Sequence, residues 1–186
     1  MGINLTKGEK VNLSKTVPSM NKIIAGLGWD MGDNSSNFDL DVSVFLLGEN
    51  GKATEDRDLI FYNNLSNKGV THKGDNRTGA GDGDDEQVEV ILSSVPENIH
   101  KIVFTITIHE AEARRQNFGQ VNNAYIRLVD QDTNNEVLKY DLSEDFSVET
   151  SLIVGEIYRN SGDWKFNAVG TGIQGDLGTL CTQFRL

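Results

Sequence analysis

The sequence predicts an all-β fold, an antiparallel β-sandwich in which residues 1–186 form a single domain. Short runs of β-type residues recur along the whole chain and are separated by Gly, Asn and Asp turns. Only one segment has a helical pattern, and no linker or low-complexity tract divides the chain. Many strands at regular spacing with almost no helix are typical of a sandwich or barrel. A chain of 186 residues also suits one domain with an ample core.

The individual elements follow from these runs. In chain order, the predicted strands are Lys22–Leu27, Phe38–Leu47, Leu59–Asn63, Gln87–Leu92, Lys101–His109, Ala124–Val129, Glu136–Leu142, Thr150–Arg159 and Trp164–Val169. The one short helix is predicted at Glu110–Asn117. Asp130–Asp141 begins like an EF-hand loop, but its strand-like flanks predict a hairpin turn. Gly170–Gly175 matches GxGxxG, yet too few residues follow for a dinucleotide site, so a glycine-rich turn is predicted.

The net charge of −11 is unevenly distributed. Residues 29–44 contain four acidic and no basic residues, and residues 75–86 contain five acidic residues against Arg77, so the two segments carry −8 of the −11. This localisation favours a site over a generally acidic surface. The overall charge argues against a nucleic-acid partner, because phosphate binding needs a basic surface.

The segment from Gly74 to Glu86, GDNRTGAGDGDDE, combines acidic side chains with glycines. Carboxylates crowded onto one loop repel one another unless a cation lies among them. Calcium selects such hard oxygen donors on flexible loops. Asp and Gly are also the usual turn formers, so the segment alone leaves a solvated turn and a metal loop equally open.

The period-2 pattern of FDLDVSVF places two further acids. Leu40, Val42 and Val44 fall on one face of the predicted strand, while Asp39 and Asp41 fall on the other, about 7 Å apart. That separation suits two ligands that converge on a metal, or one ligand for each of two ions. Asp82, Asp84 and Glu86 alternate in the same way, so their side chains could also line one face.

The chain resembles the TerD family of tellurium-resistance and stress-response proteins over its full length. The resemblance is carried by the blocks GLGWD (Gly26–Asp30), DLDVSVFLL (Asp39–Leu47), FYNN (Phe61–Asn64), HKGDNRTGAGDGDDE (His72–Glu86), FGQVNNAYIRL (Phe118–Leu128) and YRNSGDWKFNAVGTG (Tyr158–Gly172). It implies a β-sandwich that binds two neighbouring calcium ions and acts in resistance to tellurite and other stresses. It also implies membrane-associated and cytosolic protein partners from the same resistance system.

The resemblance extends the set of expected calcium ligands, since the amide oxygens of two asparagines add donors without adding charge. The expected ligands, gathered at one end of the sandwich, are Asp30, Asp39, Asp41, Asn63, Asn64, Asp75, Asp82, Asp84, Asp85 and Glu86. Asp33 is expected to stay outside this set.

Three functional hypotheses remain. The first is a calcium-dependent structural or signalling module without enzymatic activity, in the cytoplasm, since the sequence starts without the apolar run of a signal peptide. The second is a domain in which calcium bridges the protein to an anionic ligand or a membrane-associated partner. The third is a metal-assisted hydrolase, for which the sequence names no nucleophile. Direct reduction of tellurite is poorly supported, because Cys181 is the only cysteine.

Overall fold

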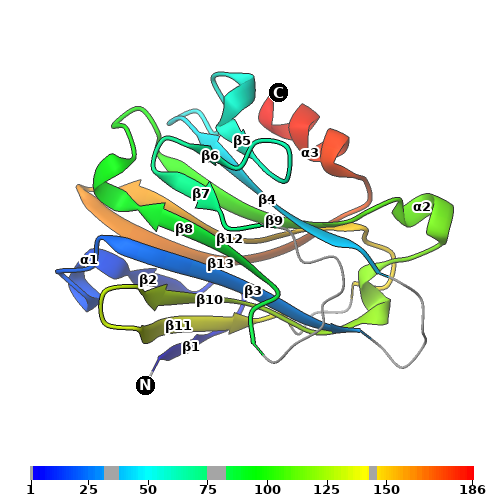
Figure 1. The fold of residues 1–186 in the computed structure, drawn as a ribbon, viewed down its shortest axis with the longest axis horizontal. Coiled ribbons are helices and arrows are strands. Elements are labelled where there is room, and N and C mark those ends of the chain that lie inside the picture. The colour runs from blue at the N-terminus through cyan, green and yellow to red at the C-terminus, as the bar shows by residue number, and fades with distance from the viewer. Residues whose placement is uncertain (1, 32–37, 75–82, 143–145) are drawn as a thin grey trace.

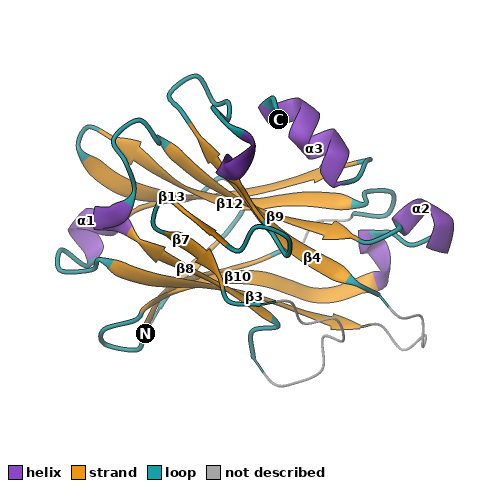
Figure 2. Ribbon diagram, turned by 45° about the horizontal axis from the view of Figure 1, so that its top comes forward, coloured by secondary structure: helices purple, strands orange, loops and turns teal. Residues whose placement is uncertain are grey.

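Two β-sheets pack face to face in the computed structural model, which describes residues 2–31, 38–74, 83–142 and 146–186. The seven-stranded sheet has the order β1 (Ile3–Leu5), β11 (Asn135–Asp141), β10 (Val121–Asp130), β3 (Lys22–Met31), β8 (Glu86–Ile91), β7 (Val70–His72) and β6 (Ser66–Asn67). The six-stranded sheet has the order β2 (Lys10–Asn12), β13 (Asp163–Ile173), β12 (Ser151–Asn160), β9 (Lys101–Ile108), β4 (Leu40–Leu47) and β5 (Leu59–Ile60). Neighbouring strands are antiparallel except β1 and β11. Figure 1 and Figure 2 show the two layers. The predicted sandwich is confirmed.

Strand β4 is buried on both faces, which explains its nearly continuous apolar sequence. Leu40, Val42 and Val44 point into the core between the sheets, as the alternation predicts. Phe45 and Leu47 point the other way, into a second apolar cluster on the outer face of the six-stranded sheet.

The second cluster is covered by α3 (Leu177–Phe184), a helix that the sequence pattern does not predict. Its buried face presents Leu180 and Phe184, and the Phe184 ring lies 4.7 Å from that of Phe45. The Asp176 side chain caps its first turn by accepting from the Thr179 N–H. The GxGxxG segment therefore ends a strand and leads into a helix.

The other differences from the predicted elements concern short elements, since the strands β1, β2, β6 and β7, of two or three residues each, were not predicted. The predicted helix at Glu110–Asn117 is a single turn, α2 (Ala111–Arg114), and a second single turn is α1 (Leu13–Thr16). The predicted hairpin after Asp130 is confirmed, because β10 and β11 pair across it. The Asp130 carboxylate accepts from the Thr133 hydroxyl within that turn.

A buried ion pair fixes the connection that leads from β4 into β5. The carboxylate of Asp58, which is fully buried, accepts hydrogen bonds from Thr54 and from the Lys68 ammonium. Burial raises the pKa of Asp58, but these hydrogen bonds outweigh it and hold the pKa below its ordinary value of 3.8. The ionised carboxylate therefore stabilises the folded state.

We expect Asp58→Asn to lower the free energy of unfolding at pH 7 by about 3 kcal/mol, because Lys68 then loses its buried charged partner and keeps only the half-exposed Glu55, 2.8 Å away. A lowered pKa gives stability that is present above about pH 4 and is lost as the pH falls through the folded-state value. Urea midpoints at pH 7, 5 and 2.5 check this, with the exposed Asp56→Asn as control. A difference between wild type and Asp58→Asn that does not shrink at pH 2.5 would contradict it.

Candidate functional site

The candidate ligands lie on segments that meet at one end of the sandwich. There β3 ends at Met31, β4 begins at Leu40 and β8 begins at Glu86 (Figure 1). Asp75 and Asp82, and also Asp33, lie outside the described residues. Within the described part of the chain, no three His, Cys, Asp or Glu side chains are grouped closely enough to hold a metal ion.

Asp30 and Asp85 are brought close together beside Trp29. The Asp85 carboxylate accepts the Trp29 backbone N–H at 2.8 Å, and the Asp30 carboxylate accepts from the Asn123 side chain at 2.6 Å. Burial, and then the negative charges of Asp30 and Asp84, raise the pKa of Asp85. Such crowding of carboxylates favours the binding of a cation.

Asp39 and Asp41 flank Leu40, whose side chain points into the core. The Asp39 Oδ1 atom is buried and has no hydrogen-bond partner among the described residues. The Asp41 Oδ2 atom lies 3.7 Å from His109 Nδ1, on the outer face of the six-stranded sheet. A buried carboxylate oxygen without a partner is costly, so a cation beside Asp39 would stabilise it.

Asp84 is held on the outer face of the seven-stranded sheet by Arg127. The guanidinium donates to both carboxylate oxygens, at 2.7 Å and 3.0 Å, and the Tyr125 hydroxyl donates to Oδ1 at 3.0 Å. Burial, and then the charge of Asp84, raise the pKa of Tyr125, so the phenol stays a protonated donor. Gly26 makes room for this carboxylate, since a Cβ there would lie 2.1 Å from Asp84 Oδ2.

Glu86 points the other way, into the space between the sheets, where it is only 2% exposed. Its Oε2 atom accepts the Val42 backbone N–H at 3.2 Å and lies 2.9 Å from His72 Nε2. His72 Nδ1 accepts the Gly74 N–H, so Nε2 carries the proton that is donated to Glu86. Glu86 thus links the two sheets.

The sequence alternation predicted that Asp84 and Glu86 would point to the same face of the sheet, and this prediction is wrong, since the two side chains point to opposite faces. Asp85 N–H donates to the Leu27 carbonyl, and Leu27 is also the residue with which Glu86 pairs. Two residues of one strand therefore stand opposite one residue of its neighbour, as in a β-bulge. This extra residue turns Asp84 to the outer face and Glu86 to the inner face.

The two asparagines follow β5. The Asn64 side chain donates to the carbonyls of Arg57 and Leu59, and its backbone pairs with Phe61. The NH2 group of Asn64 thereby stabilises the turn that follows β5, and the side-chain oxygen of Asn64 is the atom that could serve as a metal ligand. Asn63 is exposed.

These geometries sort the candidate ligands by their contacts. Asp30, Asp39, Asp41 and Asp85 supply hard carboxylate oxygens, which is the type of donor that calcium prefers, although no three of the described acidic, His or Cys side chains lie close enough to hold an ion. Asp84 and Glu86 are engaged by Arg127 and His72. Sequence reasoning missed these two partners, because nothing in the sequence indicates which basic residue on another strand faces which acid.

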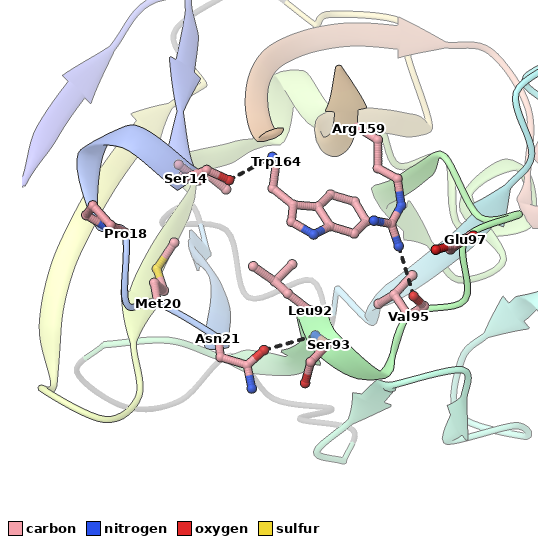
Figure 3. A pocket seen from close by; sticks show the side chains of 11 residues that line it. Ser14, Pro18, Met20, Asn21, Leu92, Ser93, Val95, Glu97, Arg159 and Trp164 are labelled. Carbon is pink, nitrogen blue, oxygen red and sulfur yellow. Dashed lines mark hydrogen bonds between the residues drawn. The ribbon is translucent and has the colours of Figure 1, made fainter. Parts of the chain in front are cut away.

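A cavity of about 400 Å³ lies between α1 and the Leu92–Ser94 turn, away from the end of the sandwich that carries the candidate calcium ligands (Figure 3). The Arg159 guanidinium stacks on the Trp164 ring, 4.0 Å from its centroid, and donates to the carbonyls of Ile99, Val95 and Pro96. Burial lowers the pKa of Arg159, and the charge of Glu97 opposes that shift. These contacts join β12 and β13 to the turn before β9, so we assign this arginine a structural role.

Comparison with known proteins identifies the class. The TerD domain matches residues 1–184, so the chain belongs to the TerD family, as its sequence motifs suggested. It is 56% identical over 190 residues to general stress protein 16U of Bacillus subtilis (strain 168), covering 100% of this chain and 98% of that protein. It is 54% identical over 187 residues to tellurium resistance protein TerD of Serratia marcescens, covering 99% and 97%.

A solved structure confirms the fold. A crystal structure of a homologue of telluride resistance protein TerD from Streptomyces coelicolor A3(2) has a TM-score of 0.68 at 19% identity, covering 87% of this chain and 95% of that one. No helix within the described residues is long and apolar enough to cross a bilayer.

Proposed function

We propose that this chain is a calcium-binding module of the tellurium-resistance and general stress response. The observation that carries the calcium site is the buried Asp39 Oδ1 atom, which has no hydrogen-bond partner among the described residues. Asp30 and Asp85 support it, because burial and, to a lesser extent, the negative charge of Asp30 raise the pKa of Asp85, and a divalent cation beside the two carboxylates would favour their ionised form. The relatives named for tellurium resistance and general stress support the biological role.

Bound calcium would join segments that are distant in the sequence. Asp30, Asp39, Asp41 and Asp85 would supply carboxylate oxygens, and Asn63 is a further candidate, as are Asp75 and Asp82, which lie outside the described residues. We assign supporting roles to Asp84 and Glu86, which position the start of β8 through Arg127 and His72.

We also propose a binding role rather than a catalytic one, acting on cytosolic and membrane-associated proteins of the same system. The arrangement of the carboxylates supports this. Asp84 and Glu86, two residues apart in sequence, face opposite sides of a sheet and already accept hydrogen bonds. They therefore do not form a pair that could act together as acid and base on one substrate.

Calorimetric titration of chelated protein with calcium tests the site. We expect two ions per chain, and we expect Asp39→Asn or Asp85→Asn to reduce the stoichiometry or the affinity, because a neutral amide supplies a weaker ligand. Asp84→Asn should bind calcium nearly as well as the wild type. Asp132→Asn, in the β10–β11 turn, is the matched control. Absence of binding heat at millimolar calcium would reject the calcium site.

A further inference from the structure

A second, larger cavity lies on the outer face of the six-stranded sheet. Its volume is about 1160 Å³, and it is bounded by α2 on one side and by the start of α3 on the other. Helix α3 covers the face above Phe45 and leaves uncovered the part around Asp41 and Thr107. Figure 2 shows α2 and α3 beside the strands of this sheet.

Acidic side chains predominate in the lining of this cavity, although Arg114 forms an ion pair with Glu110 at 3.1 Å and His109 lies 3.7 Å from Asp41. Four acids line it, from three different elements: Asp41 on β4, Glu110 and Glu112 at α2, and Asp176 at the cap of α3. His109 is the only basic side chain among the described residues that line it. A partner that enters this space is therefore favoured if it carries positive charge.

The wall of the cavity also exposes large apolar groups. Tyr62 is 45% exposed and Val148 is 54% exposed, and both line the cavity. They are two of the four large apolar side chains that stand out as exposed in the described part of the chain. Leu177 lies at the same rim. Grouped exposed apolar side chains with charged neighbours are typical of an interaction surface.

The cavity is slightly larger than typical pockets for small ligands, which range from about 300 to 1,000 Å³, so it has room for a chain segment. We propose that this cavity docks a basic segment of a partner protein, in which lysine or arginine side chains alternate with apolar ones. The cations would lie among Asp41, Glu112 and Asp176, and the apolar side chains would pack on Tyr62 and Val148. The proposal does not require calcium, since three of the four acids lie outside the candidate calcium ligands.

A defined peptide tests the surface. The probe is a fluorescein-labelled ten-residue peptide of alternating lysine and leucine, titrated with full-length protein at 150 mM salt and followed by anisotropy, with and without calcium. We expect binding that weakens about tenfold in the double variant Tyr62→Ala/Val148→Ala, since apolar anchors dominate such interfaces. Glu112→Gln should weaken binding about threefold at 150 mM salt, and the loss of affinity should be larger at low salt, where charges are screened less.

The controls separate this cavity from general attraction to an acidic protein. Ile3→Ala removes another exposed apolar side chain, on β1 and 39% exposed, and Glu49→Gln removes an exposed charge beyond the far end of β4. Both should bind the peptide as the wild type does. Equal weakening in these controls, no binding below millimolar protein, or equal affinity for spermine would overturn the proposal. A labelled ten-residue peptide of alternating glutamate and leucine serves as the charge control and should not bind.

Discussion

Calcium added to chelated protein should raise the melting temperature by about 5–10 °C for each site filled at a hundredfold excess over Kd. A ligand that binds only the folded state stabilises it by about 2.7 kcal/mol at that excess, and each kcal/mol shifts Tm by about 2–4 °C in a chain of this length. Magnesium should give a smaller shift, because it gives up its hydration water reluctantly.

The site variants make this prediction specific. Asp39→Asn should leave the melting temperature of the chelated protein unchanged, because Asp39 Oδ1 has no hydrogen-bond partner among the described residues that the substitution could disrupt. The variant should lose most of the increase with calcium, because a charged ligand has been replaced by a neutral one. Asp132→Asn should retain the whole increase. Differential scanning calorimetry measures both, and an unchanged Tm of the wild type in millimolar calcium would contradict the prediction.

The second large effect should come from Glu86→Ala, with a loss of about 3–5 kcal/mol in the free energy of unfolding. The substitution leaves the Val42 N–H and the His72 Nε2–H without an acceptor in a buried place and opens a hole between the sheets. Glu86→Gln keeps the size and one acceptor oxygen, so its loss should be about 1–2 kcal/mol.

Urea unfolding in the presence of chelator measures this effect without a contribution from metal binding. Glu89→Ala, on the same strand, removes a 3.7 Å ion pair with the exposed Lys73; it is the matched control and should cost less than about 1 kcal/mol. A loss for Glu86→Ala that equals that of the control would show that Glu86 does not join the sheets.

The fold was largely predictable from the sequence because alternation is a local signal. Leu40, Val42 and Val44 point into the core as their spacing predicts, and each predicted run contains or overlaps a strand. Helix α3 was not predictable in this way. Its sequence contains Gly178 and two threonines, which favour helix weakly, and it is stabilised by packing of Leu180 and Phe184 on the sheet.

The candidate site was predictable in composition but not in arrangement. The sequence shows the excess of acidic residues before β4 and before β8, and it also shows that acidic residues recur there with a period of two. The bulge opposite Leu27 is not visible, yet it decides that Asp84 and Glu86 face opposite sides. The pairing of Asp84 with Arg127 depends on the registers of β3 with β8 and with β10, and on the absence of a side chain at Gly26.

The pairing of the first two strands has a consequence for biosynthesis. Ile3 of β1 pairs with Leu138, and Asn12 of β2 pairs with Lys165, so each strand joins a partner made more than 130 residues later. At about 5–20 residues per second, the N-terminal segment waits on the order of ten seconds on the ribosome before those partners emerge. Both sheets are therefore completed only after β11 and β13 have been made, and β1 and β2 reach their final places later than strands whose partners lie closer in the sequence.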